Sequence, residues 1–245
     1  MVTHEENLSI STAVKTRAFV QLLKPRLSML VAFSCAFGYG LATRGDVNWL
    51  VLTVLTIAGF LLSGASVTIN QIMERDLDKL MERTKTRPLP TGRLTVQEAT
   101  YFAAACTGAA LVLLSVYTNW LTVALSVLSM VLYCWVYTPL KRVGPIAVFV
   151  GAFPGALPPL LGWIAATGAV THEAMIIFGI QFIWQFPHFW AIAWVADDDY
   201  KKAGFKLLPS GGGKDFNTAI QIMVYTMFLI PLGLLPAKFG MTGID

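Results

Sequence analysis

Long stretches without charge dominate the pattern of this chain. The longest contains no Asp, Glu, Lys or Arg between Ala99 and Leu140, and residues 47–73, 143–172, 174–196 and 216–237 are also uncharged. A helix needs about 20 apolar residues to cross the hydrocarbon core of a bilayer. The longest stretch must therefore turn once, and we expect the turn at Thr118-Asn119. The pattern predicts seven membrane-spanning helices, near residues 25–43, 48–72, 96–117, 120–138, 144–166, 174–196 and 217–237.

Composition agrees with this pattern. Hydrophobic residues make up 56% of the 245 positions and charged residues only 13%, which excludes an ordinary soluble domain. The three cysteines stand singly inside apolar segments without metal-binding or redox spacing, so we interpret them as core residues. We expect an all-α, polytopic transmembrane bundle with two parts: a tail of residues 1–20 and a single transmembrane domain of residues 21–245.

The basic residues indicate how the chain crosses the membrane. The net charge of +4 does not indicate nucleic acid, because the lysines and arginines flank apolar spans. In the predicted topology, all of the 18 basic residues except Arg44 and Lys238 fall on one side. By the positive-inside rule, this side and the N-terminus are cytoplasmic. Since the tail resembles neither a signal nor a transit peptide, we expect a multi-pass protein of a bacterial cytoplasmic (inner) membrane.

The loop after the second span carries the richest chemistry. Asn70, Glu74 and Asp78 are spaced four residues apart and share one face if the helix continues. Two carboxylates and an amide suit Mg²⁺, which completes its coordination with phosphate oxygens and water. Lys85 and Arg87 follow and could neutralise phosphate directly. The alternative is an ordinary solvated helix end.

Two further clusters end spans on the same side. Asp197, Asp198 and Asp199 follow the sixth span, either as a polar helix cap or as a second metal site. Together the two acidic clusters predict a pair of Mg²⁺ sites that clamp one diphosphate. The fourth span ends in the segment Tyr137–Arg142. Tyr137 and Lys141 could bind phosphate oxygens there. Alternatively, Tyr137 is an aromatic residue of the membrane interface, next to a basic pair that marks the cytoplasmic side.

The sixth span contains a polar stripe of Gln181, Gln185 and His188, which predicts that this face borders a cavity or the bundle interior. His188 follows a proline and has three interpretations: an axial haem ligand, a proton acceptor or a structural residue. The stripe extends to Asp199 if the helix stays regular.

These motifs resemble the UbiA superfamily of intramembrane prenyltransferases. The first acidic motif is similar to that family's N-D-x-x-D-x-x-x-D, with Gln71 and Glu74 in place of its first two aspartates. Segment 83–93 is similar to that family's sequence after the motif. Segments 151–163, 185–190, 198–204 and 207–209 are similar to the branch of protohaem IX farnesyltransferases (haem O synthases).

The resemblance implies a UbiA-like bundle, in which this chain supplies about seven of nine helices and lacks the last two. It also implies farnesyl transfer from farnesyl diphosphate to a vinyl group of haem B, with addition of water, giving haem O and diphosphate. The other implied partners are the lipid bilayer and a haem A-forming enzyme or terminal oxidase, with no nucleic acid. The implied roles are catalysis (Asn70, Glu74, Asp78, His188), Mg²⁺ binding (Glu74, Asp78, Asp198, Asp199) and diphosphate binding (Lys85, Arg87, Tyr137, Lys141, Arg142).

Two other functions compete with this interpretation. An enzyme of the same superfamily could prenylate an aromatic acid or a quinone precursor, and the identity of the acceptor would discriminate it. A secondary transporter with broken helices would place its coupling charges near the membrane midplane. The charges of this chain lie at the ends of the predicted helices, which disfavours a transporter.

Overall fold

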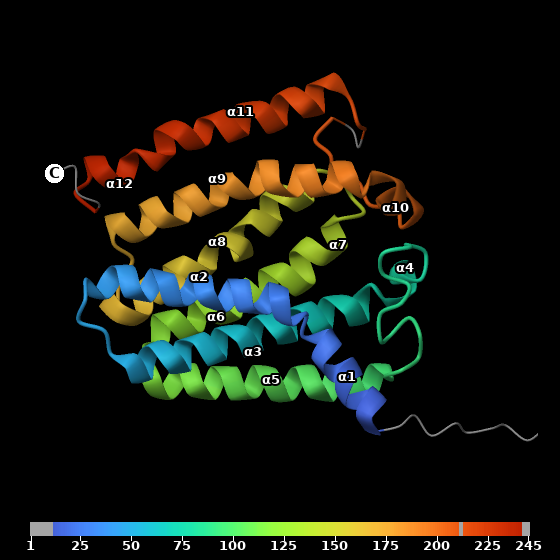
Figure 1. Ribbon diagram of the computed structural model, residues 1–245, viewed down its shortest axis with the longest axis horizontal. Helices are drawn as coiled ribbons and strands as arrows, with labels where there is room; N and C mark the ends of the chain where they lie inside the picture. Colours follow the sequence, from blue (N-terminus) through green and yellow to red (C-terminus); the bar gives the residue numbers. More distant parts are fainter. Residues whose placement is uncertain (1–11, 211–212, 242–245) are drawn as a thin grey trace, which may run out of the picture.

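The computed structural model describes residues 12–210 and 213–241 and contains only helices among them. The long helices lie side by side, roughly along the long axis of the molecule (Figure 1). Their bounds are α1 Thr12–Leu22, α2 Pro25–Thr43, α3 Trp49–Met73, α4 Arg75–Asp78, α5 Val96–Tyr117, α6 Trp120–Val131, the π-helix η1 Leu132–Tyr137, α7 Thr138–Leu140, α8 Ile146–Thr167, α9 His172–Val195, α10 Asp197–Lys202, α11 Phe216–Gly233 and α12 Leu235–Lys238.

Within residues 12–210 and 213–241, seven helical segments are long and apolar enough to span a membrane, which confirms the predicted number and fold class. The observed ends of these helices differ from the predicted ends by only a few residues. Polar residues that cap the helices mark several of these ends in the sequence. Asn119 caps α6 by accepting a hydrogen bond from the Thr122 backbone, as the predicted turn required. Thr95 and Glu98 form a capping box at the start of α5. The division into a tail and one domain stays a prediction, and residues 1–11 lie outside the described residues.

α8 is the central helix and packs against α2, α6, η1 and α9. Glycines let it approach α2 closely: a Cβ on Gly162 would collide with the Cys35 carbonyl oxygen. Prolines inside α8 leave carbonyls without intrahelical partners, because proline has no backbone N–H. The hydroxyl of Ser129 donates to one of these, the Pro154 carbonyl, at 3.4 Å. Prolines are thus tolerated inside this helix where a neighbouring helix supplies a partner for the freed carbonyl.

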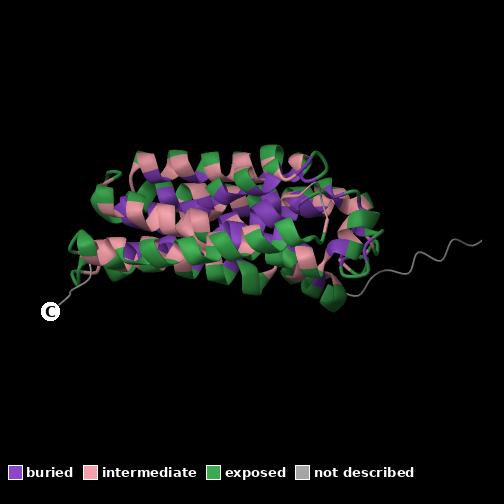
Figure 2. Cartoon of the chain, turned by 90° about the horizontal axis from the view of Figure 1, so that it is seen from above, coloured by how far each residue is buried: buried purple, intermediate pink, exposed green. Residues whose placement is uncertain are grey.

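The outer surface of the bundle is apolar. Buried residues gather along its centre, while many exposed positions lie on the outer helix faces (Figure 2). These exposed positions include large hydrophobic side chains such as Phe33, Trp120 and Val195. A soluble protein rarely exposes so much contiguous apolar surface, so this surface fits contact with lipid.

Candidate active site

A cavity of about 860 Å³ lies where α2, α3, η1, α8 and α9 meet the loops that carry most of the charge. α4 and α10 lie at this end of the molecule, and α12 lies at the other (Figure 1). The cavity's polar lining includes seven of the residues predicted for the site: Asn70, Glu74, Asp78, Arg87, Tyr137, Lys141 and His188.

Asn70, Glu74 and Asp78 form one wall of this cavity. α3 ends at Met73 and α4 begins two residues later, so the helix is interrupted at Glu74. The spacing survives because the Glu74 backbone N–H donates to the Asn70 carbonyl at 2.9 Å and the Asp78 N–H donates to the Glu74 carbonyl at 2.8 Å. All three side chains are buried, and Asp78 is fully so. The break therefore leaves the predicted shared face intact.

Each buried carboxylate has a cationic partner. The Lys141 ammonium donates to both oxygens of Glu74 at 2.8 and 3.1 Å. One guanidinium nitrogen of Arg87 donates to both oxygens of Asp78 at 2.8 and 2.7 Å. A buried charge without a partner is costly, so each cation compensates the charge of the carboxylate that it contacts. They also place two cations directly at the cavity.

The π-helix η1 shapes the wall next to Lys141. Tyr133 and Tyr137 both line the cavity, and their ring centroids are 5.5 Å apart. The Thr138 hydroxyl donates to the Tyr133 carbonyl and accepts a hydrogen bond from the Asn70 amide. The Lys141 ammonium lies 4.9 Å from the Tyr137 ring centroid, a cation–π distance. π-Helical turns often occur at functional sites.

Lys24 is a site residue that the sequence analysis counted only as a topology signal. It lines the cavity, and its backbone has the left-handed conformation (φ 44°, ψ 65°) that non-glycine residues seldom adopt. Burial lowers the pKa of Lys24 to about 7, with further lowering by the nearby charges of Arg87 and Lys141. Among the described side chains, no carboxylate forms an ion pair with Lys24. Its position directly before Pro25, at the start of the first span, is the signal that could have drawn attention to it.

The second acidic run lies outside the cavity lining. α9 ends at Val195, and the backbone breaks at Ala196 before α10, so the polar stripe of α9 does not continue regularly to Asp199. Asp197 is buried and pairs with Lys201 at 2.8 Å, whereas Asp198 is exposed. The structure thus does not bring Asp198 and Asp199 together with Glu74 and Asp78.

Asp199 instead fastens the loop that follows α4. Its carboxylate accepts hydrogen bonds from the backbone N–H groups of Glu82 (3.2 Å) and Arg83 (3.1 Å). These bonds and the Lys202 ammonium hold the pKa of Asp199 below its ordinary value. The Arg83 guanidinium also donates to the Tyr200 hydroxyl at 3.2 Å, and both of these side chains line the cavity. α10 therefore holds this loop against the cavity.

Two predicted phosphate residues also lie outside the lining. Lys85 pairs with the exposed Glu82, and Arg142 is exposed at the end of the α7 segment. Both belong to the charged end of the bundle.

On the opposite wall, α9 contributes His188, whose imidazole stacks on the Trp184 indole with ring centroids 4.5 Å apart and an interplanar angle of 16°. Gln181 and Gln185 also line the cavity. The Gln185 amide donates to the Ala152 carbonyl at 3.0 Å and so ties α9 to α8. In the predicted polar stripe, Gln185 therefore packs α9 against α8, whereas His188 forms a flat aromatic surface with Trp184 at the cavity.

No three His, Cys, Asp or Glu side chains within the described part of the chain gather closely enough to hold a metal ion by themselves. Two carboxylates and one amide do share the acidic wall. This donor set fits Mg²⁺, which commonly binds one or two carboxylates and completes its shell with substrate phosphates and water.

Comparison with known proteins identifies the family. The model of the UbiA prenyltransferase family matches residues 31–244. The chain belongs to this family. It is 54% identical to a protoheme IX farnesyltransferase from Cytophaga hutchinsonii over 232 residues, which cover 95% of this chain and 81% of the relative. It is 50% identical to a protoheme IX farnesyltransferase from Christiangramia forsetii, over 92% of this chain and 74% of the relative.

Solved UbiA structures share the fold. A digeranylgeranylglyceryl phosphate synthase superposes with a TM-score of 0.76 at 20% identity, covering 94% of this chain and 80% of that one. A UbiA homologue from Archaeoglobus fulgidus, bound to DMAPP and Mg²⁺, superposes with a TM-score of 0.68 at 19% identity, covering 90% and 75%. Membership of the family makes this chain a prenyltransferase and sets the transporter hypothesis aside.

Proposed function

We propose that this prenyltransferase transfers a farnesyl group from farnesyl diphosphate to a vinyl group of haem B, forming haem O and diphosphate. The observation that carries the donor half is the acidic wall with its paired cations, Glu74 with Lys141 and Asp78 with Arg87. The acceptor half rests on the similarity to protoheme IX farnesyltransferases.

Glu74 and Asp78, with the Asn70 amide beside them, would hold Mg²⁺. When bound, this ion neutralises charge on the diphosphate as the allylic C–O bond ionises. Asp198 and Asp199 lie outside the cavity lining, so their proposed contact with the metal runs through water and contributes little to its binding.

Three of the cations that line the cavity surround the proposed place of the diphosphate. Lys141, Arg87 and Lys24 line the cavity and donate hydrogen bonds to phosphate oxygens, which stabilises the negative charge that develops on the leaving group. Tyr137 supplies a hydroxyl on the same wall. Lys85 and Arg142 act at longer range, as positive charges at this end of the bundle.

The haem substrate would lie between α2 and α9, where apolar residues such as Leu30 and Ile192 face the cavity. The Trp184–His188 stack offers a flat surface to a porphyrin, and His188 is the haem-side residue of the proposal. The haem vinyl carbon attacks the allylic cation, and water captures the cation that results beside the porphyrin. The rings of Tyr133 and Tyr137 can stabilise the allylic cation through their faces. Phe186 and Trp190 are buried in the packing between helices, so they do not take this role.

The charged end of the bundle faces the cytoplasm of a bacterium in this proposal, because its loops carry the basic residues. Haem O then leaves through the membrane to a haem A-forming enzyme or a terminal oxidase assembly.

The test is turnover in detergent or lipid nanodiscs. The chain is incubated with haem B, farnesyl diphosphate and Mg²⁺, and the haems are separated by chromatography. A more hydrophobic haem whose mass includes farnesyl and water, lost with a chelator and with Asp78→Asn, would support the proposal. Asp76→Asn is the matched control, since Asp76 lies on the same short helix with an exposed side chain.

Two outcomes would contradict parts of the proposal. Unchanged haem B together with prenylation of an aromatic acid would replace the acceptor but retain the diphosphate site. Equal activities of Asp78→Asn and wild type would remove the acidic wall from the mechanism.

A further inference from the structure

The short connection between α1 and α2 brings Lys24 to the active-site cavity. α1 ends at Leu22 and α2 begins at Pro25, so only Leu23 and Lys24 lie between the two helices. Lys24 has the left-handed backbone conformation, which costs free energy in any residue other than glycine and persists only where the surrounding structure holds it. The contacts of this connection therefore determine where the lysine lies.

Pro25 explains why α1 ends at this point. Proline has no backbone N–H, and its ring disfavours the right-handed helical conformation in the residue before it. The last carbonyls of α1 consequently lack donors within their own helix. Leu22 carries one of these carbonyls and is fully buried. A buried carbonyl needs a hydrogen-bond donor, which here has to come from another segment.

α3 supplies this donor through two side chains. The Gln71 amide donates to the Leu22 carbonyl at 2.8 Å, and the Thr68 hydroxyl donates to the same oxygen at 3.3 Å. Gln71 is 1% exposed and Thr68 is fully buried. Hydrogen bonds in such an interior are stronger than the same bonds in water, so α3 holds the end of α1 firmly.

The amide of Gln71 is chemically suited to this contact. It also donates to the Val67 carbonyl at 3.1 Å, so both of its partners are oxygens that only accept hydrogen bonds. An ionised carboxylate has no hydrogen to offer them. Gln71 occupies the position at which the UbiA motif usually has its first aspartate, yet it does not line the cavity. Its role must therefore differ from that of the acidic wall.

Adjacent positions of α3 serve the two sides of the proposed diphosphate site. Asn70 lines the cavity as part of the acidic wall, whereas Gln71 contacts the end of α1. Consecutive helical residues point about 100° apart, which explains how neighbours reach different places. One turn of α3 thus carries the acidic wall and also the contact that precedes Lys24.

We propose that Gln71 is a positioning residue that holds Lys24 at the diphosphate through the Leu22 carbonyl. This inference rests on the proposed function, because it assumes a diphosphate between Lys24 and the acidic wall. Without the Gln71 amide, the Leu22 carbonyl loses its shorter hydrogen bond and the connection relaxes from its left-handed conformation. The Lys24 ammonium then leaves the diphosphate, while the other two cations of the site remain in place.

The test is a double-mutant cycle, measured by equilibrium binding of farnesyl diphosphate with Mg²⁺ to the nanodisc-embedded chain. Gln71→Leu removes the amide, and Lys24→Gln removes the charge. Each single variant should weaken binding about tenfold, as the loss of one charge-assisted hydrogen bond does. The double variant should bind no more weakly than Lys24→Gln, because Gln71 acts through Lys24. Independent contributions would multiply to about 100-fold.

Thr68 offers a milder second variant. Thr68→Val keeps the shape of the side chain and removes the hydroxyl, so it should weaken binding about threefold, and only while Lys24 is present. Thr68→Ser retains the donor and should bind as wild type does. This pair keeps the inference testable if Gln71→Leu does not fold.

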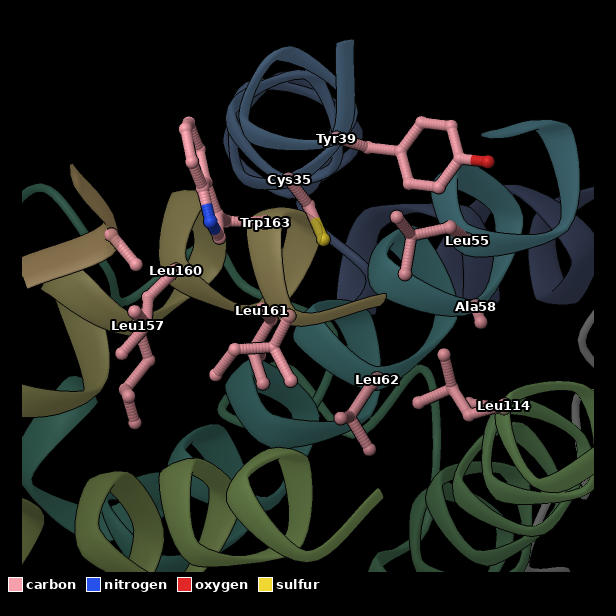
Figure 3. Packing of buried hydrophobic residues seen from close by; sticks show 13 residues of the cluster. Cys35, Tyr39, Leu55, Ala58, Leu62, Leu114, Leu157, Leu160, Leu161 and Trp163 are labelled. Atoms are coloured by element: carbon pink, nitrogen blue, oxygen red, sulfur yellow. The ribbon is translucent and has the colours of Figure 1, made fainter. Parts of the chain in front are cut away.

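Two measurements separate positioning from general damage to the bundle. In turnover, Gln71→Leu should raise KM for farnesyl diphosphate about tenfold and leave KM for haem B within about twofold of wild type. Leu160 lies in the packed apolar cluster of Figure 3 and does not line the active-site cavity. Leu160→Ala should therefore lower the thermal unfolding midpoint without changing the affinity for farnesyl diphosphate.

The outcomes distinguish this inference from the proposed function. A loss of about 100-fold in the double variant, or an equal loss of affinity in Leu160→Ala, would overturn the inference while haem farnesylation by wild type leaves the proposed function standing. The expected coupling between Gln71 and Lys24, without any farnesylation of haem, would retain the inference and reject the acceptor. Failure of wild type to bind farnesyl diphosphate would overturn both.

Discussion

Two runs of acidic side chains end membrane-spanning helices at the same end of this bundle, and they differ in what they face. Asn70, Glu74 and Asp78 line the cavity, and both of their carboxylates pair with cations from other segments. In the second run, Asp197 and Asp199 pair with lysines one turn along their own helix, and Asp198 is exposed.

Helix geometry explains the difference. Residues four apart point in nearly the same direction, and hydrogen bonds across the break at Glu74 preserve this spacing. Consecutive residues point about 100° apart, so three adjacent acids cannot face one cavity. Spacing is therefore a better indicator of a shared site here than the number of acidic residues.

The largest expected effect comes from Asp78. Asp78→Asn removes the proposed metal ligand and leaves Arg87 with a neutral partner, so we expect farnesyl transfer to fall by about 10² to 10³-fold. Steady-state haem product formation measures this. Asp76→Asn should stay within about twofold of wild type, as expected for an exposed surface charge. A similar loss in both variants would mean that α4 is merely sensitive to substitution.

The next largest effect is expected at the Glu74–Lys141 pair. Substitutions there can separate an effect on stability from an effect on activity. Breaking a buried ion pair from one side costs about 3–5 kcal/mol, whereas replacing both partners can be nearly neutral. Glu74→Gln should lower the thermal unfolding midpoint, and the double variant Glu74→Gln, Lys141→Met should recover much of it. Activity should stay low in both. Recovery of activity together with stability would show that the pair has only a structural role.

Lys24 gives a smaller, pH-dependent effect. With a pKa of about 7, its ammonium is charged below that pH and increasingly neutral above it. Only the charged form attracts phosphate, so KM for farnesyl diphosphate should rise about tenfold as pH increases through this range. Lys24→Arg should flatten the profile, since arginine stays charged. A wild-type KM that is independent of pH would exclude Lys24 from the diphosphate site.

The smallest effects are expected in the second acidic run. Asp199→Asn weakens the bonds to the backbone of Glu82 and Arg83, so we expect a loss of activity of up to about tenfold and faster proteolysis of the loop after α4. Asp198→Asn should change activity by less than about twofold. If Asp198→Asn lost as much activity as Asp78→Asn, the two acidic runs would have equal roles in the reaction.

Much of the fold follows from the sequence because membrane spans are coded locally. The length of each uncharged segment predicts a membrane-spanning helix, and a polar capping residue such as Asn119 marks where a helix begins. The first acidic motif was also predictable, since its residues belong to one helix and a short continuation. Such features require no knowledge of how distant segments pack.

The features that the sequence did not predict depend on tertiary contacts. Lys24 enters the site through an unusual backbone conformation, and the π-helix that positions Tyr133 and Tyr137 has no simple hydrophobic period. The break at Ala196 turns Asp199 toward the backbone of a loop more than 110 residues earlier in the chain. The active-site cavity is lined by residues of several helices that are far apart in the sequence, a relation that no local pattern contains.

The most direct test of the account is equilibrium binding of farnesyl diphosphate to the nanodisc-embedded chain, with Mg²⁺ or with a chelator. We predict that wild type and Asp198→Asn bind it only with Mg²⁺ and that Asp78→Asn loses binding by about 100-fold. Retained binding in Asp78→Asn, or an equal loss in Asp198→Asn, would contradict the claim that the wall formed by Asn70, Glu74 and Asp78 is the diphosphate site.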